Sequence, residues 1–80
     1  MKKTQGIGVR DVFPRTALEA SRTATEVGFY LKRSKAVSRF RVVNERNTPK
    51  LMVMKEGERY AEVEKNVFED AVGVLRREET

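Results

Sequence analysis

The stretch LKRSKAVSRFRVV, residues 31–43, carries five cations and no acid. Phosphate groups attract cations that have no competing carboxylate nearby, and the forked donors of arginine match phosphate oxygens. A solvated surface that only keeps a small domain soluble could have the same composition. We interpret the stretch as the candidate surface for a polyanionic partner. Its cations are Lys32, Arg33, Lys35, Arg39 and Arg41.

The distribution of charge along the chain agrees with this interpretation. Residues 1–55 hold 13 Lys or Arg and 4 Asp or Glu, a balance of +9, whereas residues 56–80 hold 4 and 8, a balance of −4. A basic body favours a polyanion such as nucleic acid, and the acidic end also permits two copies to associate head to tail. We expect residues 1–10 to form a flexible basic arm that extends the interface with Lys2, Lys3 and Arg10.

A second set of side chains that could do chemistry is acidic. Glu62 and Glu64 alternate along a predicted strand, with Glu56 and Glu58 just before it. Paired carboxylates can bind Mg²⁺ or act as general acid and base, but such catalysis needs a cleft that separates their pKa values. A chain of 80 residues has a thin core and little room for a deep cleft. We interpret these acids as a charged strand that discourages aggregation, and expect no enzymatic activity.

The composition excludes several other kinds of site. The chain has no histidine and no cysteine, so the commonest general base, disulfides and the usual nitrogen and sulfur ligands of zinc are absent. We therefore expect no metal and no other cofactor. The apolar runs are far shorter than the roughly 18 residues of a membrane helix, and the start MKK is not followed by the apolar segment of a signal peptide. These features predict a cytoplasmic protein without membrane contact.

A helix over residues 16–33 is predicted to lead into the basic stretch. Thr16 and Glu19 have the spacing of a capping box, in which the hydroxyl accepts a hydrogen bond from the amide three residues on. Gly28 leaves open that the helix ends there and that residues 29–33 form a short strand. Apolar residues recur at helical spacing, namely Ala17, Ala20, Ala24, Val27 and Leu31.

Three strands and a second helix are predicted to follow. Segment 37–45 is rich in β-branched and aromatic residues and predicts the first strand, and segments 51–55 and 58–64 are the candidates for the second and third. Turn-prone residues separate the three segments. The short connections imply an antiparallel meander. Asn66 is expected to cap the last helix, whose apolar stripe consists of Val67, Phe68, Ala71, Val72 and Leu75.

This order of elements predicts an α+β fold, a small α-β-β-β-α domain over residues 11–80. A three-stranded antiparallel sheet would have both helices packed on one face, which leaves the other face open. Side chains alternate along a strand. Because Phe40 belongs on the covered face, Arg39 and Arg41 should project from the open face, about 6.8 Å apart along the strand. The same alternation assigns Val37 and Val43 to the open face.

Methionines and tyrosines are further candidates for the open face. Met52 and Met54 could face either the core or the open side. Filling the core is the commoner role, whereas exposed methionines would join the valines of the open face in an apolar patch suited to protein contacts. Tyr30 and Tyr60 could stack on unpaired bases, but a chain with six aromatic residues needs most of them in its core.

The predicted order of elements resembles that of double-stranded RNA-binding domains, which also run helix, three antiparallel strands, helix. The resemblance covers residues 16–78 and rests on topology alone. Members of that family bind phosphates with a basic cluster at the start of the last helix, where this chain has Glu64-Lys65-Asn66-Val67. The resemblance therefore assigns no binding residue to this chain. The stretch LMVMKEGERYAEVEKNVFEDAV, residues 51–72, also resembles the wing and closing helix of phage excisionases, which are small DNA-bending proteins.

The sequence thus predicts a small, basic, non-enzymatic protein that binds DNA or RNA. Phosphate contacts would dominate, and the absence of a recognition helix predicts a weak sequence preference. The alternative function is a protein-binding or inhibitory module, of the type that phages and mobile elements encode, which docks on an acidic surface of a larger host protein. A homodimer formed through the methionine and valine face is compatible with both functions.

Overall fold

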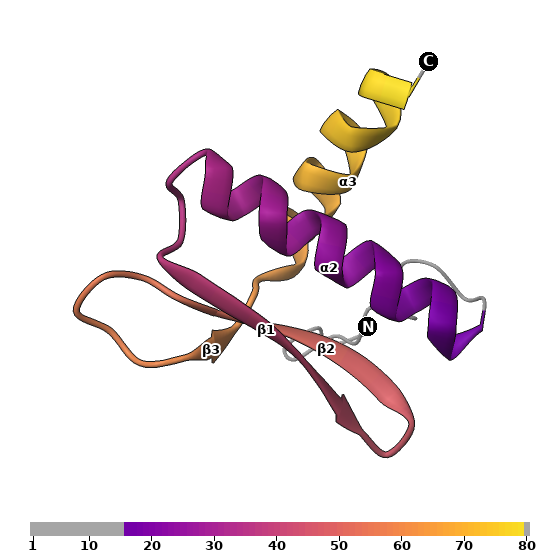
Figure 1. Ribbon diagram of the computed structural model, residues 1–80, viewed down its shortest axis with the longest axis horizontal. Helices are drawn as coiled ribbons and strands as arrows, with labels where there is room; N and C mark the ends of the chain where they lie inside the picture. Colours follow the sequence, from indigo (N-terminus) through magenta and orange to yellow (C-terminus); the bar gives the residue numbers. More distant parts are fainter. Residues whose placement is uncertain (1–15, 80) are drawn as a thin grey trace, which may run out of the picture.

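The computed structural model describes residues 16–79. Over this range the chain forms helix α2 (Ala17–Arg33), strands β1 (Arg39–Glu45), β2 (Thr48–Met54) and β3 (Ala61–Glu62), and helix α3 (Lys65–Glu79). The strands form one antiparallel sheet in the order β1-β2-β3. Figure 1 shows both helices on the same side of this sheet. The predicted α+β fold and its order of elements are therefore confirmed, whereas the expected arm of residues 1–10 lies outside the described residues.

Helix α2 begins as its sequence predicts and then covers the sheet. The Thr16 hydroxyl accepts a hydrogen bond from the Glu19 amide at 3.1 Å, which satisfies an amide that the helix itself leaves unpaired. One side of the helix is buried against β1 and β2. Ala17, which was expected on that side, is exposed because it lies in the first turn, before the buried stripe begins. The buried residues are Ala20, Ala24, Val27, Gly28 and Leu31.

The closest approach of α2 to the sheet occurs at Gly28. A Cβ atom at this position would overlap the ring of Phe40 on β1. The same ring meets Phe29 edge to face, with the two ring centroids 5.1 Å apart. The helix continues through Gly28 to Arg33, so this glycine provides room for an aromatic ring and does not end the helix.

A two-residue turn joins β1 and β2. Arg46 and Asn47 both have positive φ, 53° and 64°, which is the conformation of a type I′ hairpin turn. Glu45 pairs with Thr48 across this turn, so β2 begins earlier than the predicted start at residue 51. The strand consequently includes Pro49, at a position where β2 has β1 as its neighbour and β3 does not reach.

Strand β3 is much shorter than the predicted segment 58–64. Only Ala61 and Glu62 pair with β2. The residues before them form a turn, closed by a 2.9 Å hydrogen bond from the Glu58 amide to the Lys55 carbonyl. Gly57 adopts a φ of 80° in this turn, a backbone conformation that suits glycine. Beyond Ala61 and Glu62 the chain turns away into α3. Most of β2 therefore has a neighbouring strand only on the side of β1.

Helix α3 begins one residue before the expected cap. The Glu64 carbonyl accepts a 3.0 Å hydrogen bond from the Phe68 amide, so Asn66 lies inside the first turn and is not the cap. Phe68, Ala71 and Val72 of this helix are buried, and α3 packs mainly against α2. Neither α2 nor α3 is long and apolar enough to cross a lipid bilayer.

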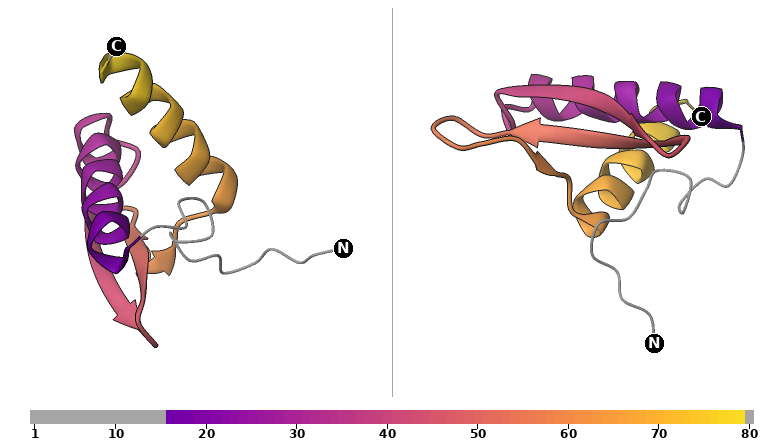
Figure 2. Two further views of the ribbon diagram at one scale, coloured as in Figure 1. Left: turned by 90° about the vertical axis from the view of Figure 1, so that its right-hand side faces the viewer. Right: turned by 90° about the horizontal axis from the view of Figure 1, so that it is seen from below.

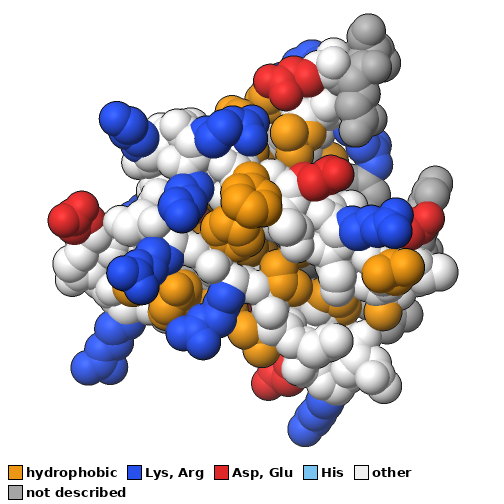
Figure 3. All heavy atoms as spheres, viewed as in Figure 1, with side chains coloured by type: hydrophobic (Ala, Val, Ile, Leu, Met, Phe, Trp, Pro, Cys, Tyr) orange, Lys and Arg blue, Asp and Glu red, His pale blue; other side chains and the backbone are white. Residues whose placement is uncertain are grey.

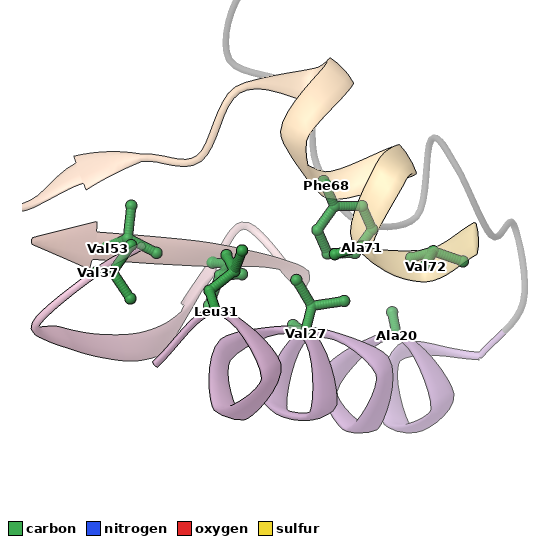
Figure 4. Packing of buried hydrophobic residues seen from close by; sticks show 10 residues of the cluster. Ala20, Val27, Leu31, Val37, Val53, Phe68, Ala71 and Val72 are labelled. Atoms are coloured by element: carbon green, nitrogen blue, oxygen red, sulfur yellow. The ribbon is translucent and has the colours of Figure 1, made fainter. Parts of the chain in front are cut away.

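The core lies between the sheet and the two helices. Figure 4 shows Phe68 of α3 directed into the space above Val27, with Ala71 and Val72 beside it. Val37, which was expected on the open face, is only 7% exposed and belongs to this core. It precedes β1, where the chain is still leaving the end of α2, so the alternation of the strand does not govern its side chain. The opposite face of the sheet is turned toward the viewer in the right-hand view of Figure 2.

Candidate nucleic-acid interface

Strand β1 presents Arg39 and Arg41 on the face of the sheet that the helices leave uncovered. Both arginines are exposed, whereas Phe40 and Val42 are half-buried and pack against the core. This alternation confirms the predicted orientation of the two arginines. Val43, on the same face as the arginines, is 38% exposed, as the alternation predicts. We refer below to this uncovered side of the sheet as the open face.

Strand β2 adds two methionines to the open face. Arg41 pairs with Met52, and Arg39 pairs with Met54. The expectation that the methionines fill the core is wrong, because Leu51 and Val53 occupy the core positions of the strand, with exposures of 1% and 9%. Each arginine therefore has a half-buried methionine directly opposite it, at the short side-chain separation of cross-strand pairs.

Tyr60 packs against Arg41 just before β3 begins. The guanidinium carbon Cζ of Arg41 lies over the aromatic ring, 4.2 Å from the ring centroid. This contact is a cation–π interaction, which holds the arginine against a flat apolar surface while leaving it charged. Tyr30, the other tyrosine considered for stacking, packs instead against the core. The sequence alone does not connect Tyr60 with Arg41, because their contact depends on how β3 pairs with β2.

The remaining cations of the basic stretch lie where α2 ends. Lys32 and Arg33 occupy its last turn, and Lys35 lies in the turn that leads toward β1. All three are exposed. Figure 3 shows Lys and Arg side chains gathered on the part of the surface where α2 ends and β1 begins, around exposed apolar atoms. Cations at this end also offset the negative end of the helix dipole, so they have a structural role as well.

The turn after α2 fixes the backbone position of Lys35. The Ala36 amide donates a hydrogen bond to the Leu31 carbonyl, and the Lys35 amide donates to the Lys32 carbonyl. These two bonds define a Schellman motif, whose left-handed position usually holds glycine. Lys35 takes that position with a φ of 66°. A lysine here is strained relative to glycine, so its side chain is present at some cost in stability.

The cations of the basic stretch have no acidic partners in the described part of the chain. None of the five forms an ion pair within 4.0 Å with an acid of residues 16–78. Lys50, at the other end of the open face, differs, because its Nζ atom lies 2.9 Å from Glu45 and 3.9 Å from Glu62. The hydrogen bond and charge of Lys50 hold the pKa of the Glu45 carboxyl below its ordinary value. One end of the open face is thus internally neutralised, and the other is not.

Two further cations lie near the interface, and the sequence analysis missed them. Lys55 and Arg59 are exposed in the loop after Met54. Because Met54 pairs with Arg39, this loop begins at the same end of the sheet as the basic stretch. Only the strand register shows that Lys55 and Arg59 lie near the interface. Two glutamates of the same loop, Glu56 and Glu58, offset their charge. The predicted contacts Lys2, Lys3 and Arg10 lie outside the described residues.

The acidic residues considered for catalysis or metal binding are not brought together by β3. This strand ends at Glu62, so Glu64 does not share a strand face with it as expected. Glu62 lies instead within ion-pair distance of Lys50, at 3.9 Å. Within residues 16–78, no three His, Cys, Asp or Glu side chains are grouped in a way that could hold a metal ion.

No protein-family model, curated protein or solved structure matches this chain. The observed order of elements agrees with that of double-stranded RNA-binding domains. At the start of α3, where that family has its basic cluster, the Lys65 Nζ atom lies 3.9 Å from the Glu69 carboxylate. The phosphate-binding position of that family therefore holds an ion pair here, whereas the five cations of the basic stretch form none with the acids of residues 16–78.

Proposed function

We propose that this protein binds nucleic acid, DNA or RNA, through the phosphate backbone. The contacts would come from the five cations of the basic stretch, extended by Lys2, Lys3 and Arg10. The observation that carries the proposal is that all five are exposed and lack an acidic partner within 4.0 Å among residues 16–78. Phosphates would supply the missing anions. The protein would act in the cytoplasm without a cofactor.

The arrangement supports contacts to phosphates more than contacts to base edges. Arg39 and Arg41 are held on a strand, and the other three cations lie at the end of a helix and in its following turn. Sequence readout needs an element that enters a groove and presents several base-reading side chains. Within residues 16–79, no helix or hairpin projects from the open face in this way. We therefore expect similar affinities for nucleic acids of different sequence.

The proposal predicts that binding depends strongly on salt. Phosphate contacts release condensed counterions, so the logarithm of the association constant should fall linearly with the logarithm of salt concentration. With four or more contacts formed, the slope should be about −3 or steeper. Fluorescence anisotropy with a labelled oligonucleotide, titrated at about 50 and 200 mM salt, measures this slope. Affinity that does not change with salt, or no binding at the lower concentration, contradicts the proposal.

Replacing Lys35 with glycine should raise stability and weaken binding at the same time. Glycine relieves the strain of the left-handed position and should raise the free energy of unfolding by about 0.5 to 1 kcal/mol. Loss of the cation removes about one phosphate contact, so the salt slope should become shallower by about one unit. Thermal unfolding and the anisotropy titration measure the two effects on one sample. A Lys35→Gly variant that binds as the parent does would remove Lys35 from the interface.

A second candidate function, docking on an acidic protein surface, is favoured by the apolar part of the open face. Met52 and Met54 lie there half-buried, and a protein partner could cover them. Protein interfaces concentrate their energy in a few desolvated anchors. This function predicts that Met54→Ala weakens partner binding as much as Arg39→Ala does. For binding that depends on phosphates, the arginine variant should have much the larger effect.

A further inference from the structure

The open face is divided into a cationic side and an apolar side. Arg39 and Arg41 lie on β1, which is an edge strand, whereas Lys50 of β2 lies within ion-pair distance of Glu45 and Glu62. The next strand, β2, contributes Met52 and Met54, and Tyr60 follows on the side of β3. Moving across the sheet from β1, a ligand therefore meets positive charge first and apolar surface second.

Binding of phosphates does not by itself account for the apolar side of the open face. Phosphate oxygens need cations and hydrogen-bond donors. The methionines supply neither, and Tyr60 supplies only its hydroxyl. Unpaired bases, in contrast, stack on aromatic rings and on the flat guanidinium of arginine, and they pack against apolar side chains. A duplex keeps its bases stacked inside, so they cannot reach a flat surface of this kind.

The contact between Arg41 and Tyr60 provides a stacking surface that exists before any ligand binds. The guanidinium carbon is 4.2 Å from the ring centroid, and the arginine is exposed to solvent. Because the tyrosine already holds the arginine side chain, less conformational entropy is lost when a base stacks there. Met52, directly opposite Arg41 on β2, continues the same surface.

We propose that the open face binds single-stranded nucleic acid, with phosphates along β1 and unpaired bases on Arg41, Tyr60 and Met52. This inference rests on the proposed function and adds the strandedness of the ligand to it. The sugar–phosphate backbone of the ligand follows the cations of β1 and of the end of α2, and its bases point across the sheet toward β2. Glu62 lies next to Met52 on the far side of the sheet and within 3.9 Å of Lys50, so that side offers phosphates less positive charge than β1 does.

Three ligands of equal length distinguish this inference from the proposed function. They are oligo(dT), an abasic strand that keeps every phosphate but lacks bases, and a DNA duplex. The full chain should bind oligo(dT) at least about fivefold more tightly than either other ligand, since stacking of even one base contributes that much. If the abasic strand or the duplex binds as tightly as oligo(dT), the inference is overturned and the proposed function stands. If none of the three binds, the proposed function fails as well.

Variants at the stacking surface test which residues hold the bases. Arg41→Lys keeps the charge but loses the flat guanidinium, and should weaken binding of oligo(dT) about threefold while changing binding of the abasic strand by less than twofold. Tyr60→Ala should weaken binding of oligo(dT) about tenfold. It should change binding of the abasic strand by less than about twofold. Arg22→Lys, the same exchange at an exposed position in the first half of α2, is the matched control and should change neither affinity. Equal losses for both ligands would show that no base is held there.

Tyrosine fluorescence gives a direct measurement that does not depend on truncating the site. The chain has two tyrosines and no tryptophan, so in a Tyr30→Phe variant all tyrosine emission comes from Tyr60. Stacking of a base near the ring should quench this emission as oligo(dT) saturates the protein, whereas the abasic strand should leave it within about 10% of its starting value. Unchanged emission at saturation with oligo(dT) would overturn the inference.

Discussion

Replacing Gly28 with alanine is expected to lower the free energy of unfolding by about 3 kcal/mol. The added methyl group would overlap the ring of Phe40, so either the ring must leave its position or the helix must move off the sheet. Neither change is small, since Gly28 is buried and Phe29 also contacts the same ring. A domain of this size has a total stability of roughly 4 to 12 kcal/mol. Thermal unfolding should therefore show a fall in midpoint of about 12 to 24 °C.

The other helical glycine provides the matched control. A Cβ at Gly73 in α3 would meet the Arg77 Nη1 atom at 3.6 Å, an ordinary contact. Gly73→Ala should raise stability by about 0.5 to 1 kcal/mol, because alanine favours the helix. A double-mutant cycle with Phe40→Leu completes the test. The loss caused by Gly28→Ala should be smaller in that background, since the overlapping ring is absent. If Gly28→Ala behaves like Gly73→Ala, the ring of Phe40 does not pack against Gly28.

Removing both arginines of the open face is expected to weaken nucleic-acid binding about 150-fold or more at low salt. Arg39 and Arg41 are the cations that β1 holds in place, and each charged hydrogen bond to a phosphate contributes about 1.5 kcal/mol or more. The salt slope of the Arg39→Ala/Arg41→Ala variant should become shallower by about two units. Stability should fall by no more than about 1 kcal/mol, because both side chains are exposed, form no ion pair within residues 16–78, and lose only the cation–π contact of Arg41 with Tyr60.

The control for this variant removes the same charge elsewhere. Arg22→Ala/Arg76→Ala takes the formal net charge of +5 to +3, as the interface variant does, but at exposed positions on α2 and α3. Anisotropy titrations at two salt concentrations should show a loss of less than about threefold for the control. Equal losses for the two double variants would mean that overall charge attracts the ligand without a defined interface. Full binding by the Arg39→Ala/Arg41→Ala variant would rule out the open face.

The features that the sequence predicted correctly depend on neighbours along the chain. The hydroxyl cap at Thr16 involves a residue three positions away, and the stripe from Ala20 to Leu31 repeats at helical spacing. The orientation of Arg39 and Arg41 follows from the alternation of a strand, once Phe40 is assigned to the core. In each case the interacting atoms are brought together by the local backbone conformation, so the local sequence contains the necessary information.

The errors concern residues whose surroundings come from distant parts of the chain. Val37 is buried because of the path between α2 and β1, and β3 is short because the chain turns into α3. Apolar side chains occupy both faces of β2, so composition did not decide whether Met52 and Met54 or Leu51 and Val53 face the core. The position of α2 on one face of the sheet decided that question.

The sequence by itself determined the order of the elements, the orientation of the arginines on β1 and the excess of cations around them. Only the tertiary structure decided what lies beside those arginines. Tyr60 reaches Arg41, and Met52 lies opposite it, because β1, β2 and β3 pair in one particular register. Gly28 likewise has its role only because Phe40 is packed against it. Strand register and helix packing are set by the burial of the whole core, and no short segment of the chain specifies them alone.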